Sequence, residues 1–215
     1  MNTIIITHND QEFASKIAEL LFDKYVKSIK LYDSFNIGLT GGNTPKLIYK
    51  CLVTSYLDKF DWNKVNFFFV DERCVPMDSP NSNYNLANEL LFSFLPTANV
   101  YRFETELPGE EGVKKYRDYL IKETIHCALL GMGEDGHVGS IFPNAYEEYT
   151  QESVIITKDA HNGWKRFSLS IDSINRIRDK ILMINKSQIK EEIIKQKNKN
   201  LPINKIENMT IIINS

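Results

Sequence analysis

The part of this 215-residue sequence best suited to chemistry is a glycine-rich segment in which a carboxylate precedes a histidine by two positions. Asp135 and His137 lie there, on either side of Gly136. Imidazole titrates near neutral pH, so His137 can take a proton from water, while Asp135 can fix its tautomer or position that water. The glycines at 131, 133 and 136 also match a dinucleotide-binding spacing. A histidine inside the loop, and the lack of a clear acidic residue ending a following strand, make that interpretation weak.

Three charged residues, Asp71-Glu72-Arg73, follow the apolar run Asn66–Val70. The planar guanidinium of Arg73 can hold an oxyanion, a carboxylate or a phosphate. Asp71 can orient a neighbour or serve as a base. On charge pattern alone, a solvated cluster with local salt bridges is the simpler interpretation.

A third segment pairs two glycines with the expected start of a helix. Its residues are Gly41, Gly42, Asn43 and Thr44, followed by Pro45. Glycine lets a ligand approach the main chain, Thr44 is a candidate N-cap and Pro45 a candidate first helical residue. Free backbone N–H groups at such a helix start suit a phosphate or another anion, although a tight strand-to-helix turn without a ligand explains the pattern equally well.

Amphipathic helices alternate with short apolar strands along the chain, which predicts a Rossmann-like α/β fold with a mostly parallel central sheet flanked by helices. Asp10 is expected to cap a first helix. Strands are expected at Phe35–Leu39, Val65–Val70, Val100–Phe103, Cys127–Leu130, Val154–Thr157, Arg166–Ile171, Ile181–Ile184 and Met209–Ile213. Further helices are expected at Lys46–Ser55, Tyr84–Phe94, Gly112–Glu123 and Gln188–Gln196. Because ligands bind beyond the C-terminal ends of parallel strands, the three segments should converge on one site.

Composition narrows the class of protein. The net charge of -2 lacks the basic footprint of a nucleic-acid binder. The three cysteines, isolated from one another, predict neither a disulfide framework nor a zinc knuckle. With no apparent signal peptide and no long apolar run, we expect a cytoplasmic protein that has no membrane partner and holds no metal.

Several segments together resemble the 6-phosphogluconolactonase family, within the glucosamine/galactosamine-6-phosphate isomerase superfamily. The likeness covers nearly the whole chain, in the expected order. It is carried by Gly38–Pro45, Phe69–Pro76 with its continuation to Tyr84, Leu129–His137, Ser140–Pro143, and more faintly Arg166–Ser170 and Lys190.

The resemblance implies a single lactonase domain over residues 1–215 that works without a cofactor, as a monomer or weak homodimer. It implies hydrolysis of 6-phospho-D-glucono-1,5-lactone to 6-phosphogluconate, with His137 as the general base that activates water. The family's Asp-Gly-His aspartate matches Asp135, and its Asp-Glu-Arg arginine matches Arg73. The substrate phosphate is expected on the Gly41–Thr44 loop, Arg166 and Lys190.

Two departures from the family pattern leave alternatives open. Asn43 stands where many relatives have serine, and Lys186 competes with Lys190 as the phosphate lysine because the preceding turn is irregular. An amino-sugar-phosphate deaminase or isomerase would carry Asp-Glu-Tyr and Phe-Asn-Glu-Pro sequences where this chain has Asp71-Glu72-Arg73 and Ser140–Pro143. A non-catalytic sugar-phosphate-binding regulator would usually add a DNA-binding segment, which this sequence lacks. Both rivals therefore rank below the lactonase.

Overall fold

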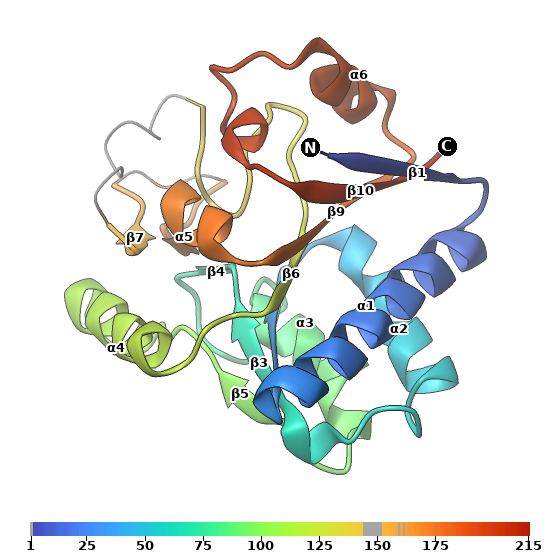
Figure 1. The fold of residues 1–215 in the computed structure, drawn as a ribbon. Coiled ribbons are helices and arrows are strands. Elements are labelled where there is room, and N and C mark those ends of the chain that lie inside the picture. Colours follow the sequence, from blue (N-terminus) through green and yellow to red (C-terminus); the bar gives the residue numbers. More distant parts are fainter. Residues whose placement is uncertain (1, 144–151, 159, 161) are drawn as a thin grey trace.

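A computed structural model describes residues 2–143, 152–158, 160 and 162–215. Its centre is a seven-stranded sheet in the order β1-β10-β9-β6-β2-β3-β5, and every neighbouring pair in that sheet is parallel. A three-stranded antiparallel sheet, β4-β8-β7, accompanies it. Figure 1 shows both ends of the chain at the β1–β10 edge of the large sheet.

The described elements alternate between strand and helix over most of the chain. The strands are β1 Thr3–Thr7, β2 Phe35–Leu39, β3 Val65–Phe69, β4 Asp71–Arg73, β5 Asn99–Tyr101, β6 Cys127–Leu130, β7 Val154–Ile156, β8 Arg166–Leu169, β9 Asp179–Asn185 and β10 Met209–Asn214. The α-helices are α1 Asp10–Tyr32, α2 Asn43–Ser55, α3 Asn83–Leu90, α4 Gly109–Lys122, α5 Ile171–Arg176 and α6 Gln188–Gln196. Short 3-10 turns lie at Trp62–Lys64, Phe92–Phe94 and Pro202–Lys205.

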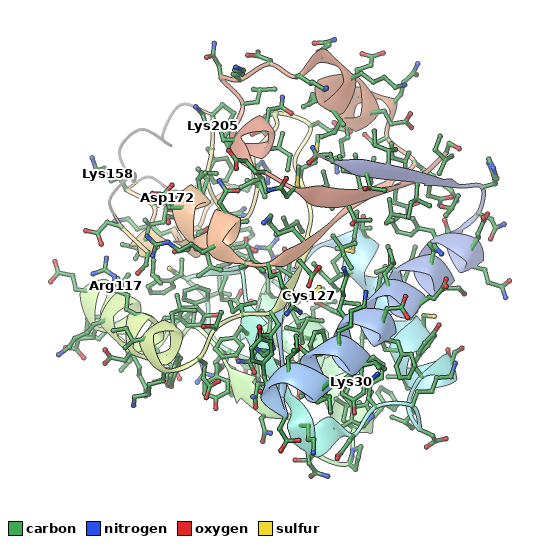
Figure 2. The ribbon with its side chains drawn as sticks, viewed as in Figure 1. Lys30, Arg117, Cys127, Lys158, Asp172 and Lys205 are labelled. Atoms are coloured by element: carbon green, nitrogen blue, oxygen red, sulfur yellow. The ribbon has the colours of Figure 1, made fainter. Side chains whose placement is uncertain are left out.

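Burial explains why the central strands are short and almost wholly apolar. Every residue of β2 and β6 is buried, as expected for parallel strands covered on both faces. Helices α1 and α2 lie together on one side, whereas α4 and the small sheet lie on the other (Figure 1). Figure 2 shows Cys127 of β6 in the interior and Arg117 of α4 toward the outside, and Lys30 of α1 is exposed. The core therefore fills both layers between the sheet and its helices.

The strand order creates a crevice at one end of the sheet. From β2 the chain moves outward through β3 to β5, and then returns to place β6 on the other side of β2. Where the direction reverses, the segments that leave the C-terminal ends of β2 and β6 separate and open a space for a ligand. The small sheet adjoins this end, because β4 begins directly after Val70, whose N–H bonds to Leu39 O of β2.

The predicted α/β class with a mostly parallel central sheet is confirmed, and several local predictions were wrong. Asn9 rather than Asp10 caps α1, since its Oδ1 accepts the N–H of Glu12 at 2.8 Å. Gly42 rather than Thr44 is the N-cap of α2. Residues 71–73, which were not predicted as a strand, form a short one, and the expected helix 84–94 ends at residue 90 and is followed by a 3-10 turn at Phe92–Phe94. Strand β1 and helix α5 were not predicted.

Candidate active site

The three suspected segments converge on one cavity of about 230 Å³ at the C-terminal ends of the parallel strands. Of the residues predicted to act in catalysis or substrate binding, all but Asp135 line it. They are Gly41, Gly42, Asn43, Thr44, Asp71, Arg73, His137, Arg166 and Lys190. Two larger cavities, of about 310 and 330 Å³, lie around the segment that enters β6 and contain none of these residues. We place the candidate site in the smaller cavity because charged and titratable side chains from separate elements meet there.

His137 is held by Asp135, which is exposed and is not one of the residues that line the cavity. Oδ1 of Asp135 lies 2.7 Å from the ring Nδ1 and accepts the backbone N–H of His137 at 3.1 Å. With Nδ1 as the donor, Nε2 carries a lone pair and can accept a proton. Gly133 makes room for the pair, since a Cβ there would lie 2.2 Å from Nδ1. This arrangement has the geometry of an oriented general base.

Phe142 is a neighbour of His137 that was not singled out as a site residue. Its ring centroid lies 4.7 Å from that of the imidazole, and the Arg166 guanidinium lies 5.7 Å from the same ring. Phe142 thus contacts both the candidate base and a candidate phosphate ligand. Phe142 belongs to the Ser140–Pro143 stretch that carries part of the family resemblance, and this was the sequence signal that could have identified it.

Arg73 and Arg166 lie on neighbouring strands of the small sheet. They are directly opposite in the antiparallel pairing of β4 with β8, and both line the cavity. Burial lowers the pKa of Arg166, and the positive charge of Arg73 lowers it further. Like charges directly opposite on paired strands destabilise a sheet, whereas an anion between them relieves the repulsion. The pair is therefore suited to a phosphate or an oxyanion.

Helix α2 directs its first turn at the same cavity. Its N-cap Gly42 has φ +95°, a backbone conformation that favours glycine, and no side chain caps the helix. Gly41 is pressed against Asn83, since a Cβ on Gly41 would lie 1.7 Å from Asn83 Oδ1. The positive end of the helix dipole and the first free N–H groups suit an anion.

The structure separates the two candidate phosphate lysines. Lys190, in the first turn of α6, lines the cavity. Lys186 pairs with Asp10 at 2.9 Å and is absent from the cavity lining. This placement favours Lys190 for contact with an anion in the cavity.

Asp71 is buried and accepts hydrogen bonds from three different segments. Its Oδ1 accepts from Thr40 Oγ1 at 3.1 Å and from Asn83 Nδ2 at 3.4 Å, and its Oδ2 accepts from Ser140 Oγ at 2.9 Å. The carboxylate is therefore placed to orient neighbours. Thr40 and Asn83 also line the cavity, and sequence reasoning had assigned neither of them a role.

Glu72 points away from the cavity, as the alternation of a strand requires. Its carboxylate accepts the N–H groups of Asn83 at 2.7 Å and Tyr84 at 2.8 Å, and the hydroxyl of Ser82 at 3.1 Å. Burial raises the pKa of Glu72, against the effect of these hydrogen bonds. Glu72 thus holds the start of α3, and a solvated charge cluster is the wrong description of residues 71–73.

No group of three or more His, Cys, Asp or Glu residues in the described part of the chain is arranged to hold a metal ion. None of the described helices is long and apolar enough to cross a membrane.

Comparisons with known proteins show the family to which the chain belongs. A 6-phosphogluconolactonase from Thermotoga maritima is 38% identical over 146 residues, which are 66% of this chain and 65% of that protein. One from Haemophilus influenzae is 31% identical over 86% of both chains. The crystal structure of the Thermotoga maritima 6-phosphogluconolactonase superposes over 100% of both chains with a TM-score of 0.89 and 28% identity. The family model described as glucosamine-6-phosphate isomerases/6-phosphogluconolactonase matches residues 8–212, and this chain therefore belongs to that family.

Proposed function

We propose that residues 1–215 form one lactonase domain that hydrolyses 6-phospho-D-glucono-1,5-lactone to 6-phosphogluconate. The observation that carries the proposal is the shared cavity, in which an Asp135-oriented His137 and the opposed Arg73 and Arg166 meet. A base and an anion site in one cavity suit a substrate with an ester at one end and a phosphate at the other. The names of the relatives support the same substrate.

In the proposed mechanism, His137 Nε2 removes a proton from water as the water oxygen bonds to the lactone carbonyl carbon. The carbonyl oxygen becomes negatively charged and is stabilised by Arg73 or by backbone N–H groups. The bond between the carbonyl carbon and the ring oxygen then breaks. The protonated His137 returns its proton to the ring oxygen, which becomes the new hydroxyl of the product.

The phosphate is assigned to a second group of residues that line the cavity. The Gly41–Thr44 loop supplies N–H groups at the start of α2, while Arg166 and Lys190 supply positive charge. Asp71 orients the loops, and Asp135 holds the ring of His137. No step of this scheme requires a cofactor.

Activity is tested with purified protein on freshly prepared 6-phosphogluconolactone, by following lactone loss against the spontaneous rate. His137→Ala should lower kcat by about 10²-fold or more, the usual scale for loss of a general base. Asp135→Asn keeps the shape of the side chain and should reduce kcat less than His137→Ala. Near-wild-type turnover by a folded His137→Ala protein would contradict the assignment of the base.

A parallel assay distinguishes the proposed lactonase from its main rival, an amino-sugar-phosphate deaminase. The wild-type protein is incubated with glucosamine 6-phosphate, and ammonia release is measured. Ammonia release without accelerated lactone loss would replace the proposed lactonase with a deaminase.

A further inference from the structure

We propose that the buried carboxylate of Asp71 bridges the anion-binding loop and the base loop, with Thr40 and Ser140 as positioning residues that fix the separation of the two loops. The anion-binding loop is residues 40–44, and the base loop is residues 131–140. This inference rests on the proposed function, because it assigns a phosphate to the first loop and a carbonyl to the second.

The bridge consists of two hydroxyl groups and one carboxylate. Thr40 directly precedes Gly41 of the anion-binding loop and donates to Asp71 Oδ1 at 3.1 Å. Ser140 ends the base loop three positions after His137 and donates to Asp71 Oδ2 at 2.9 Å. The exposed fractions of Thr40, Asp71 and Ser140 are 6%, 4% and 0%. Water therefore competes little for these bonds, and the carboxylate holds both loops at once.

Further bonds fix the backbone around each hydroxyl. The N–H of Ser140 donates to Ser168 Oγ at 3.0 Å, and that hydroxyl donates to Leu169 O at 2.8 Å. On the other side, the hydroxyl of Tyr49 donates to Thr40 O at 2.7 Å. Each loop is thus anchored to its own scaffold, β8 or α2, and Asp71 connects the two.

Asn83 adds a third connection to Asp71. Its Nδ2 donates to Asp71 O at 2.9 Å, and the opposite end of its amide presses against Gly41. A displacement of Asp71 therefore moves the anion-binding loop through two independent contacts. The partner of His137 is a different carboxylate, that of Asp135, so Asp71 acts on the base only through the loop that carries it.

A fixed separation matters because the proposed substrate is bound at two ends. Binding energy gained at the phosphate lowers the barrier only if it places the carbonyl carbon correctly against His137. If the loops can shift relative to each other, the phosphate still binds, but the ester is held off position. Loss of the bridge should therefore leave phosphate affinity intact but reduce the rate gain that the bound phosphate gives to ester hydrolysis.

The test uses Thr40→Val, Ser140→Ala and the double variant. Thr7→Val is the matched control, because Thr7 is equally buried and donates its hydroxyl to Ile213 O away from the cavity. Thr40→Ser keeps the hydroxyl group and should therefore retain the activity that Thr40→Val loses. Each bridge variant should lower kcat/KM for the phosphorylated lactone by about 10- to 100-fold, the scale for a substrate displaced by around 1 Å. The loss of activity on unphosphorylated gluconolactone should be clearly smaller than the loss on the phosphorylated lactone, inhibition by inorganic phosphate should be retained, and the double variant should be no worse than the poorer single one.

A second readout does not depend on turnover. Inorganic phosphate should shift the NMR signals of the His137 imidazole in the wild-type protein, and the shift should be smaller in both bridge variants. The bridge would be overturned if the variants lost equal activity on the two lactones, or if inorganic phosphate inhibited them less well. It would also be overturned if phosphate shifted the His137 signals as much in the variants as in the wild type, or if the losses in kcat/KM of the two single variants added in the double variant. If the wild-type protein fails to hydrolyse the lactone while the variants still lose the imidazole response, the proposed function fails and the bridge stands.

Discussion

Gly133→Ala should disable the base loop without unfolding the protein. A Cβ at this position would lie 2.2 Å from His137 Nδ1 and 2.4 Å from Asp135 Oδ1. Real Cβ atoms essentially never approach another heavy atom below 3.0 Å, so the imidazole must retreat by at least the difference, about 0.8 Å. The side chains of His137 and Asp135 are 28% and 51% exposed, which lets them swing toward solvent.

The size of the effect follows from that displacement. Moving a catalytic group by about 1 Å costs up to ~10²-fold in rate, or roughly 2.7 kcal/mol at 1.36 kcal/mol per tenfold change. The free energy of unfolding should change by less than about 1 kcal/mol, because the loop side chains can relax outward. The φ angle of Gly133 is not among the positive φ angles of the described residues, so alanine at this position should add no backbone strain.

The assay compares kcat on the phosphorylated lactone with the thermal midpoint and with the NMR signals of the His137 imidazole. Gly131→Ala is the control for ring position and stability, since a Cβ there meets no heavy atom within 4 Å. Wild-type kcat in a folded Gly133→Ala protein would refute the idea that this glycine protects the Asp135–His137 pair. An imidazole signal displaced equally by both variants would refute it as well.

Three further predictions concern the phosphate, metals and pH. Lys190→Ala should raise KM for the phosphorylated lactone by about 10-fold or more, as expected for a lost hydrogen bond to a charged group, while Lys186→Ala should not; equal losses on unphosphorylated gluconolactone would point to structural damage. Activity should persist after exhaustive chelation, and restoration by one metal after complete loss would overturn the mechanism. Burial lowers the pKa of His126, whose Nδ1 accepts the N–H of Asn36 at 3.1 Å. The folded protein therefore resists protonation there, and stability should be lost as pH falls from about 6.5, the unfolded value, through the lower folded one. Urea unfolding at pH 7 and pH 5 should show a smaller decline for His126→Gln than for the wild type, and identical declines would contradict this.

The parallel sheet could be predicted because its signals are local. Phe35–Leu39 and Cys127–Leu130 are short apolar runs, and both are strands with every residue buried. Strand β1 was missed although Thr3–Thr7 is a short run of β-branched residues, which favour strands. It lies at the sheet edge, where Ile4 and Ile6 are exposed, so its position could not be read from the burial expected of a central strand.

The site was predictable as a set of residues but not as a geometry. Glycine spacing and the Asp-Gly-His turn mark the loops, and strand order brings them together. No local pattern indicates that Arg73 pairs with Arg166, because the contact joins a three-residue strand to a segment far along the chain. Likewise, Ser140 donates a hydrogen bond to Asp71, and the sequence around neither residue indicates that bond.

The opposed positions of Arg73 and Arg166 in the small sheet link anion binding to the stability of the folded protein. Burial and the charge of Arg73 lower the pKa of Arg166, whereas Asp71 and Glu72 raise it, so an anion bound beside the two arginines adds a favourable charge interaction that the unfolded chain lacks. A ligand that binds only the folded chain stabilises it by about 2.7 kcal/mol at 100 times its dissociation constant. Under the proposed function the phosphorylated lactone is such a ligand, and it should slow unfolding and proteolysis of the purified protein.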